Sequence, residues 1–506
     1  MAPFSLSKKS LLWLLMPISA VCVAFYGNRI LNLNPSQCAL LSHALPGGVS
    51  YPNTTTYAAS LTSYWSVQEE SFSPSCIISP QNTKEVATAV GILSAQLPQY
   101  AVDFAIRGGG HTPFAGSANI DGGIVIDLRA LNGVDVNAKQ TIASVGAGAI
   151  WGEVYSKLDT LGLAVIGGRG STIGVGGLTT GGGISFFSPR KGFACDNVAN
   201  YEVVLAGGRI VNANREENPD LWLALKGGIN NFGIVTRFDL LAFPQADFWG
   251  GMIVWDDSAV PQLLSALAAL DTADYDEFAA LILSMAFVSS SGFIASGTIQ
   301  YTKPEANPPT FQPFTSAMPQ YANSMRISNL TDFVTEFVEL QGNGKRQLYV
   351  TSTFQSSLAF LTEIYSHFKA TLPPFSNVPN FVASLTLQPI SPDLVSKAAA
   401  LGGNSLGLQS PTPPLVLCLL AFTWESAGDD AAVEALGKSL NAWIVDQAKI
   451  GGLWNQWVYL NYAASWQNPI GGYGAVNKVK LQAASRKYDP TGVFQKRVPG
   501  GFKLFV

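Results

Sequence analysis

Charged residues are scarce in this chain, and their scarcity excludes several classes of protein. They make up 13% of the 506 residues, against about 25% in ordinary soluble domains. The net charge is −4 and no basic run follows the first few residues, so the signature of a nucleic-acid-binding protein is missing. Hydrophobic residues reach 47% and glycines number 49, which indicates a large apolar interior with many tight turns. The length suffices for two or three domains.

Histidine is also rare, with only His43, His111 and His367. His367 falls in a predicted helix with no cysteine or histidine near it, so the sequence indicates no metal site. The motif Gly146-x-Gly148-x-x-x-Gly152 departs from the spacing of a dinucleotide-binding fingerprint, and no acidic residue ends a strand about 20 residues later. Nicotinamide binding is therefore not expected.

The N-terminus has the pattern of a targeting segment. Lys8 and Lys9 precede the apolar run Leu11–Phe25, which is shorter than the roughly 20 residues that a membrane span needs. We predict a signal peptide over residues 1–25, cleavage near Ala24, and a secreted protein without membrane attachment. A retained N-terminal membrane anchor is the alternative.

Other features agree with the secretory pathway. Asn53 and Asn329 each begin an acceptor sequon and are predicted glycosylation sites. Cys38 and Cys76 flank the start of the mature chain and could close a loop. Cys195 and Cys418 stand among apolar residues and are predicted to be buried thiols.

The chain divides by composition at Pro244. Residues 37–244 are rich in glycine and short strands, and they form the first predicted domain. In residues 245–453, glycine thins and helical stretches alternate with strands, which indicates a second domain that faces the substrate. Residues 454–506 return to the style of the first domain. The sequence carries no signal for a particular oligomeric state.

Two glycine clusters in the first domain are typical of ligand-binding loops. The first is Arg107-Gly108-Gly109-Gly110-His111, followed by Thr112 and Ser117. Its bare backbone lets a large ligand approach closely, and a histidine stands directly at its end. The second runs from Ile173 through Gly174, Gly176 and Gly177 to Gly181, Gly182 and Gly183. Successive N–H groups without side chains favour binding of a pyrophosphate.

These clusters, with the later strand that contains Ile234 and Val235, resemble the flavin domain of the vanillyl-alcohol-oxidase flavoproteins. Their berberine-bridge-enzyme-like branch is the most similar. Tyr459-Leu460-Asn461-Tyr462, the segment around Asn477, and Tyr488–Phe494 resemble its C-terminal motifs. A glycine-rich β-solenoid or jelly roll would explain the glycines but not this order.

The resemblance implies an α+β, two-domain PCMH-type FAD-binding fold, with a substrate domain of antiparallel sheet covered by helices. It implies that His111 bonds covalently to the 8-methyl carbon of FAD, and that Cys38 pairs with Cys76. The implied contacts to the cofactor include Ile234, Val235, Asn461 and Asn477, and the segment Tyr459–Tyr462 is expected to be a strand beside the flavin ring.

Three positions depart from the family pattern. Gly170 stands where doubly attached relatives have a cysteine, so the FAD is predicted to be attached through His111 only. Leu419 stands where some relatives carry the base, so the base must come from elsewhere, and tyrosine is the best candidate. Tyr459 is the first choice and Tyr462 the second, although Tyr459 also suits a pocket wall. Ile173 stands where a valine admits oxygen, which predicts either slow reoxidation by oxygen or another electron acceptor.

The function expected from these residues is FAD-linked oxidation of a small-molecule alcohol or related group by an oxidase or dehydrogenase. Natural-product biosynthesis, with a possible coupled cyclisation, is the favoured setting. The alternatives are a carbohydrate oxidase that acts on an oligosaccharide, and a flavin protein with a non-redox cyclase role.

Overall fold

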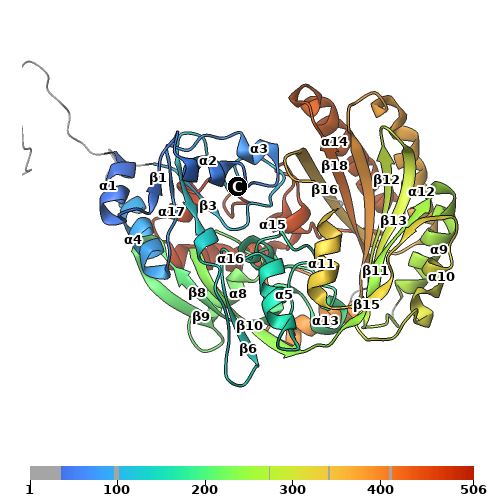
Figure 1. The fold of residues 1–506 in the computed structure, drawn as a ribbon, viewed down its shortest axis with the longest axis horizontal. Coiled ribbons are helices and arrows are strands. Elements are labelled where there is room, and N and C mark those ends of the chain that lie inside the picture. The colour runs from blue at the N-terminus through green and yellow to red at the C-terminus, as the bar shows by residue number, and fades with distance from the viewer. Residues whose placement is uncertain (1–35, 96–101, 273, 340–341, 410–412) are drawn as a thin grey trace, which may run out of the picture.

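The computed structural model describes residues 36–95, 102–272, 274–339, 342–409 and 413–506, and Figure 1 shows their arrangement. The predicted signal peptide at residues 1–25 lies outside this part of the chain. Two bodies lie side by side, with the substrate domain on the right of the figure. The sheet of the substrate domain includes strands from β11, which begins at Phe248, to β19 at Trp454–Asn455.

The first domain contains a small, mostly parallel sheet. Its order is β1-β2-β4-β3, and β2, β4 and β3 run parallel. The strands are β1 (Val49–Ser50), β2 (Cys76–Ile78), β3 (Phe104–Arg107) and β4 (Ile124–Asp127). The side chains of β4 are buried, as expected for a parallel strand covered on both faces. Strand β3 ends at Arg107, so the first glycine loop begins at the end of this sheet.

The second sheet is antiparallel and centres on the long strand β10 (Ile234–Pro244). Its order is β5-β6-β10-β8-β9, and β7 also pairs with β10. The other strands are β5 (Val134–Val136), β6 (Ile142–Gly146), β7 (Leu163–Val165), β8 (Val198–Val204) and β9 (Ile210–Asn214). The helices of the two N-terminal sheets are α1 (Gln37–Ala44), α2 (Thr55–Leu61), α3 (Val67–Glu70), α4 (Thr83–Leu93), α5 (Trp151–Asp159), α6 (Val175–Thr180), α7 (Ser188–Lys191) and α8 (Pro219–Leu225).

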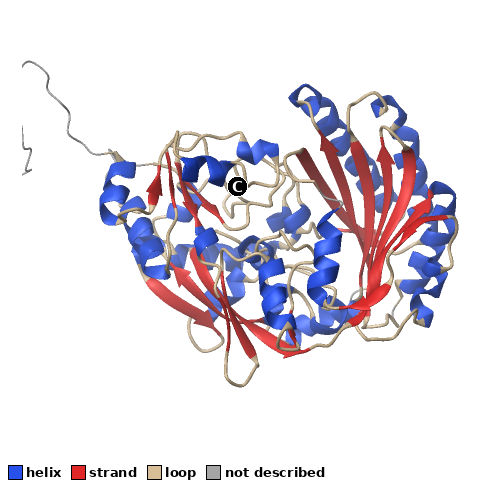
Figure 2. Cartoon of the chain, in the orientation of Figure 1, coloured by secondary structure: helices blue, strands red, loops and turns tan. Residues whose placement is uncertain are grey.

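The substrate domain is a nine-stranded antiparallel sheet of order β14-β11-β13-β12-β17-β18-β16-β19, with β15 paired to β11. Its strands are β11 (Phe248–Asp256), β12 (Ala279–Val288), β13 (Gly292–Tyr301), β14 (Gln320–Asn323), β15 (Arg326–Ser328), β16 (Arg346–Gln355), β17 (Val382–Ile390), β18 (Leu415–Trp424) and β19. Helices α9 (Val260–Leu270), α10 (Gln312–Thr315), α12 (Leu358–Thr371) and α14 (Asp430–Ile450) cover its outer face (Figure 2). The predicted antiparallel sheet covered by helices is confirmed.

Glycine in the outer layer lets one helix lie close to this sheet. A Cβ on Gly437 of α14 would come 3.1–3.3 Å from the side chains of Leu348, Val350 and Phe422. The inner face of the sheet carries no such helical layer and turns toward the first domain. Helices α11 (Leu330–Glu339) and α13 (Pro392–Ala400) join the two bodies, since α11 contacts α5 and α13 contacts α7.

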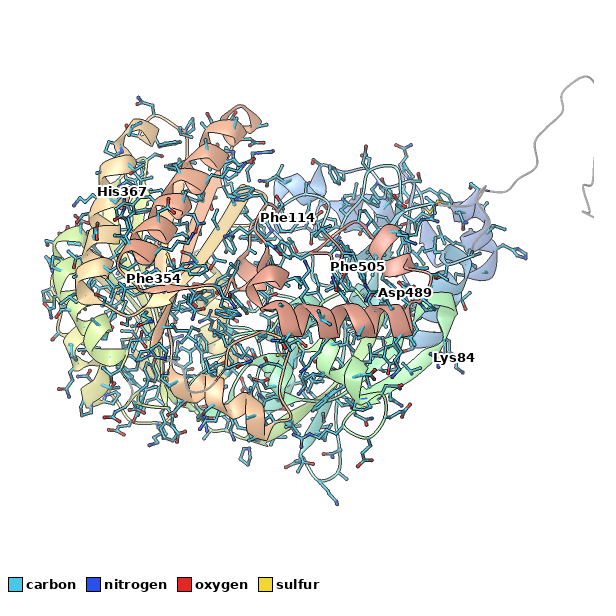
Figure 3. The ribbon with its side chains drawn as sticks, turned by 180° about the vertical axis from the view of Figure 1, so that it is seen from behind. Lys84, Phe114, Phe354, His367, Asp489 and Phe505 are labelled. Carbon is cyan, nitrogen blue, oxygen red and sulfur yellow. A yellow bond between two sulfur atoms is a disulfide. The ribbon has the colours of Figure 1, made fainter. Side chains whose placement is uncertain are left out.

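The C-terminal segment packs against the first domain. It forms α15 (Pro469–Gly472), α16 (Ala475–Tyr488) and α17 (Val493–Lys496). The carboxylate of Asp489 accepts hydrogen bonds from the N–H groups of Val493 and Phe494, which fixes the turn between α16 and α17 (Figure 3). The Phe104 N–H donates to the Arg497 carbonyl, so this segment is tied to β3.

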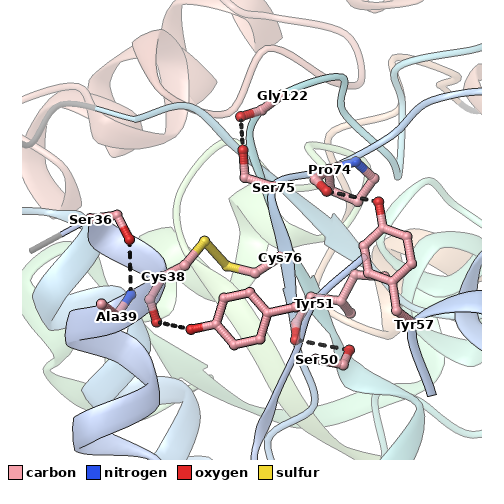
Figure 4. The surroundings of a disulfide bond; sticks show 11 residues. Ser36, Cys38, Ala39, Ser50, Tyr51, Tyr57, Pro74, Ser75, Cys76 and Gly122 are labelled. Atoms are coloured by element: carbon pink, nitrogen blue, oxygen red, sulfur yellow. Dashed lines mark hydrogen bonds between the residues drawn. A yellow bond between two sulfur atoms is a disulfide. The ribbon is translucent and has the colours of Figure 1, made fainter. Parts of the chain in front are cut away.

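The predicted disulfide is present. Cys38 of α1 is bonded to Cys76 of β2 across 38 residues of sequence (Figure 4). The Tyr51 hydroxyl donates to the Cys38 carbonyl at 3.0 Å and orders the same corner. Cys195 and Cys418 are buried free thiols, as predicted. Asn53 and Asn329 are both exposed, so their side chains are accessible for glycosylation.

Candidate active site

A cavity of about 730 Å³ separates the glycine loops of the first domain from the inner face of the substrate sheet. The first-domain side includes Gly108–Thr112, Ser117, Ile173, Gly174, Gly176, Gly177, Ile234 and Val235. The sheet side consists of alternate residues of β11, β12, β13, β16, β17 and β18. Among the described residues that line it, Arg169 is the sole charged side chain, and none is a carboxylate.

His111 stands at the centre of an aromatic contact. Its ring stacks on Trp65 with 4.5 Å between centroids and 12° between planes. The backbone N–H of Trp65 donates to the Gly110 carbonyl, so the tryptophan is bonded to the loop that it covers. The Thr172 hydroxyl lies 3.4 Å from Nε2 of His111. Burial lowers the pKa of His111 to about 4, which keeps the imidazole neutral and nucleophilic at ordinary pH.

Two buried side chains, Arg107 and Glu69, hold the first glycine loop from the side away from the cavity. Arg107 does not line the cavity; its guanidinium lies 3.6 Å from the ring centroid of Tyr64 and donates to the Ser60 carbonyl. Glu69 of α3 is fully buried, and its carboxylate accepts from the N–H groups of Gly116, Ser117 and Ala118. Burial raises the pKa of Glu69 to about 7. These two side chains fix the loop that presents His111.

The two glycine clusters cross each other at van der Waals distance. A Cβ on Gly109 would lie 2.6 Å from the Cα of Gly174, so neither position admits a larger residue. Gly177 borders open space in the cavity. In the described chain, the N–H groups of Gly109, Gly110 and His111 donate to no other backbone group.

The later predicted glycines and Asn477 lie outside the cavity lining. The Gly183 N–H donates to the hydroxyl of Tyr459, and Gly181 and Gly182 pack against Asn461 and Tyr459. The Asn477 side chain of α16 donates to the carbonyl of Tyr473, which directly follows α15. These residues shape the wall rather than face the cavity.

The segment Tyr459–Tyr462 is not the expected strand. Leu460–Tyr462 form a 3-10 turn in which the Ala463 N–H donates to the Leu460 carbonyl. The turn is favoured because it buries Leu460 while both tyrosine rings face the cavity, at 81° to each other. A flat strand would alternate these side chains between opposite faces. The Asn461 amide bonds both the Leu178 carbonyl and the Tyr459 hydroxyl.

Tyr462 has a cationic partner that the sequence did not reveal. A guanidinium N–H of Arg169 donates to the Tyr462 hydroxyl at 2.7 Å, and the same nitrogen donates to the Gln388 side chain at 2.6 Å. Tyr459 differs: it is buried, its hydroxyl accepts from the Gly183 N–H and the Asn461 amide, and burial raises its pKa well above the usual range. Arg169 therefore distinguishes the two tyrosines.

The three positions that depart from the family pattern all lie at or beside the cavity. Leu419 lines the sheet side, between Thr386 and Thr351 on neighbouring strands. Ile173 lines the loop side. A Cβ on Gly170 would meet Val338 of α11 at 2.9 Å, so α11 fills the space into which a longer side chain would extend.

Sequence reasoning missed Trp65, Tyr349, Gln388 and Arg169. Arg169 carried a usable signal, because a lone charge between glycines in an apolar stretch needs a buried partner. No local pattern marks Trp65, which reaches the site from the turn between α2 and α3.

Outside this cavity, the described residues form no group of three or more histidine, cysteine, aspartate or glutamate side chains that could hold a metal ion. His367 stacks on Trp443 in the outer helical layer, with 3.9 Å between ring centroids (Figure 3). No helix in the described part of the chain has the length and apolarity needed to cross a membrane.

The fold and the cavity define an FAD-linked oxidoreductase, and comparison with known proteins agrees. The FAD binding domain family matches residues 74–214. An FAD-dependent monooxygenase of Cochliobolus heterostrophus is 37% identical over 96% of this chain and 93% of its own length. The bifunctional solanapyrone synthase of Alternaria solani is 34% identical over 92% of this chain and 88% of its own length.

Solved structures share the fold. Xylooligosaccharide oxidase from Myceliophthora thermophila C1 in complex with xylobiose has a TM-score of 0.74 at 20% identity, over 93% of this chain and 100% of that chain. Berberine-bridge-enzyme-like proteins have the same fold. The chain belongs to the family of FAD-linked oxidoreductases that includes the FAD-dependent monooxygenases of Cochliobolus heterostrophus and Fusarium proliferatum.

The residues present fit FAD. The unpaired N–H groups at Gly109–His111 and the open space at Gly177 suit a pyrophosphate that lies between the two loops. Ile234 and Val235 supply an apolar wall on the same side. His111 faces the cavity as a neutral imidazole, the form that an attachment to the cofactor requires.

Proposed function

We propose that this protein is a secreted enzyme that uses FAD, attached through His111 alone, to oxidise a small, largely apolar alcohol in natural-product biosynthesis. When bound, FAD supplies the acceptor for the two electrons that an alcohol loses on becoming a carbonyl compound. Oxygen, reduced to hydrogen peroxide, is the proposed final electron acceptor. The residues of the chain bind the alcohol, orient it and remove the proton of its hydroxyl group.

The observation that carries this proposal is the composition of the sheet side of the cavity. Most of its side chains are aliphatic, namely Met252, Val254, Ile282, Ala286, Val288, Ile294, Val382, Leu419 and Ala421, or small and hydroxylic, namely Ser284, Ser296, Thr298, Ser384, Thr386 and Thr423. The exceptions are Gln347, Tyr349 and Gln388. Such a surface favours a flat or compact apolar molecule. An oligosaccharide would instead call for several aromatic platforms, and the sheet side offers a single aromatic ring, that of Tyr349.

Tyr462 is the proposed proton acceptor. The described lining contains no carboxylate, and the base position of some relatives is held by Leu419, so a phenol is left for this role. Tyr462 receives a charge-assisted hydrogen bond from Arg169, whereas the pKa of Tyr459 is raised by burial. Tyr459, with Asn461, then serves as the wall that fixes the 3-10 turn and orients Tyr462.

Secretion is supported by the same residues that predicted it. The Cys38–Cys76 bridge belongs to an oxidising compartment, and both predicted glycosylation asparagines are exposed. Expression with the native N-terminus in a secreting fungal host should place glycosylated protein in the medium. Retention in the cell membrane would favour the anchor alternative.

Oxygen uptake tests the proposed activity directly. The purified protein is incubated with benzylic and polyketide-like alcohols and, separately, with xylobiose and cellobiose, while oxygen and hydrogen peroxide are measured. The proposal expects turnover with one or more of the apolar alcohols and none with the sugars. Turnover of sugars alone would replace it with the carbohydrate oxidase reading.

A further inference from the structure

Three hydroxyl groups on the sheet side of the cavity form a linked cluster. The Thr386 hydroxyl lies 2.8 Å from that of Ser284 and 3.0 Å from that of Ser384. Ser284 is on β12, the other two are on β17, and all three line the cavity. Ser284 and Thr386 face each other directly across the two strands. We call these three residues the hydroxyl cluster.

One hydroxyl proton of the cluster has no hydrogen-bond acceptor in the described chain. Three hydroxyls carry three protons, and the two bonds inside the cluster consume two of them, whichever way the bonds run. In the described chain, these side chains make no other hydrogen bond. One O–H therefore points at the cavity, and the hydrogen bonds behind it polarise it and strengthen it as a donor.

The hydroxyl cluster lies a short distance along β17 from the end of the cavity that contains Tyr462, the proposed proton acceptor. Thr386 and Gln388 project from the same face of β17, two residues apart, which places their backbones about 7 Å apart. Gln388 accepts from Arg169, and Arg169 donates to Tyr462. Aliphatic side chains, including Ile282 and Leu419, surround the interval between the two polar points.

We propose that the hydroxyl cluster binds a neutral acceptor oxygen of the substrate, such as a ketone, at the end of the molecule opposite the alcohol. This inference rests on the proposed function for the position of the alcohol. It narrows the substrate class to flat apolar alcohols that also carry a carbonyl oxygen about one fused-ring width away. A free donor without an accepting group on the ligand would be left unsatisfied, so molecules lacking that oxygen are disfavoured.

Binding of two simple probes tests the proposal without depending on oxidation. 1-Tetralone and tetralin share their fused rings, only the first has a ketone, and neither carries an alcohol. Their dissociation constants for the flavin-loaded protein are measured from changes in the flavin absorbance spectrum. Thr386→Val removes the central hydroxyl at nearly constant volume. Thr298→Val makes the same change at a cavity-facing position outside the cluster.

The wild-type protein is expected to prefer tetralone, and Thr386→Val to reduce that preference about tenfold by weakening only the binding of tetralone. Ser384→Ala should act in the same direction, and Thr298→Val should keep most of the preference. The proposal is overturned if neither probe binds, if the preference survives in Thr386→Val, or if Thr298→Val loses as much. Failure of the proposed oxidation alone would leave these affinities unchanged.

Discussion

The guanidinium of Arg169 donates to the hydroxyl oxygen of Tyr462 at 2.7 Å, inside a cavity whose described lining holds no other charged side chain. Arg169 is buried, and in the described chain its one other hydrogen bond runs from the same nitrogen to the neutral amide of Gln388. A buried cation without a carboxylate partner stabilises negative charge that develops nearby. In its phenolate form, Tyr462 is the group placed to hold that charge until it accepts the proton of the substrate hydroxyl, when the charge passes to the substrate oxygen.

This contact predicts how three substitutions rank. Tyr462→Phe should slow anaerobic flavin reduction by an alcohol substrate by roughly 10²–10⁴-fold, because the base is removed while the ring remains. Arg169→Met should also slow it, since the hydrogen bond that the cation donates to Tyr462 is lost. Tyr459→Phe serves as the matched control, with a smaller effect. Stopped-flow absorbance measures all three, and a larger loss in Tyr459→Phe would move the base to that residue.

The attachment of FAD should depend on His111 and on its ionisation. The wild-type flavin should stay with the protein after acid precipitation, and His111→Ala should release it. Because burial lowers the pKa of His111 to about 4, the imidazole is neutral above that pH and protonated below it. The rate at which FAD becomes covalently bound to flavin-free protein should thus be flat from pH 5 to 8 and fall near pH 4. Loss of the rate around pH 6.5, the ordinary value for histidine, would contradict this environment.

Much of this architecture could be predicted from the sequence, for a physical reason. A large cofactor that lies against bare backbone requires glycine at fixed positions, and the crossing of Gly109 with Gly174 shows how strict that requirement is. The order of the glycine loops along the sequence therefore predicts the fold. The disulfide and the antiparallel sheet of the substrate domain were likewise predicted.

The contacts that set the chemistry were harder to predict, because they join distant parts of the chain. Arg169 meets Tyr462 across 293 residues, and Ser284 meets Thr386 across 102. The Tyr459–Tyr462 segment was expected to be a strand because it resembles the family's motif, but Leu460–Tyr462 form a 3-10 turn in which Leu460 is buried. The later glycines and Asn477 matched the family motif and yet support the wall from outside the cavity.

Access of oxygen should respond to Ile173. This side chain lines the cavity beside the crossing of the glycine loops and is one methylene larger than valine. Ile173→Val should speed reoxidation of the reduced enzyme by oxygen and leave its reduction by substrate nearly unchanged. The two half-reactions are measured separately by stopped flow. Fast reoxidation in the wild type that does not change in the variant would exclude Ile173 as a gate.

The N-terminal disulfide should stabilise the folded protein and have no effect on the rate of flavin reduction. Cys38 and Cys76 close a loop of 38 residues, for which the chain-entropy estimate is about 4 kcal/mol. Replacement of both cysteines by serine should lower the midpoint of thermal unfolding and leave the rate of flavin reduction unchanged. Peptide mapping without reduction checks the pairing in the secreted protein, and recovery of both residues as free thiols would contradict the pairing and the secreted location together.

The central claim is that the cavity oxidises an apolar alcohol, and anaerobic bleaching of the bound flavin tests it most directly. The oxygen-free protein is mixed with each polyketide-like alcohol of the panel and with xylobiose, and the flavin absorbance is followed in a single turnover. We expect rapid bleaching by an alcohol that carries a carbonyl group at the end of the molecule opposite its hydroxyl group, and none by xylobiose. Bleaching by xylobiose alone, or a flavin that no compound reduces, would contradict it.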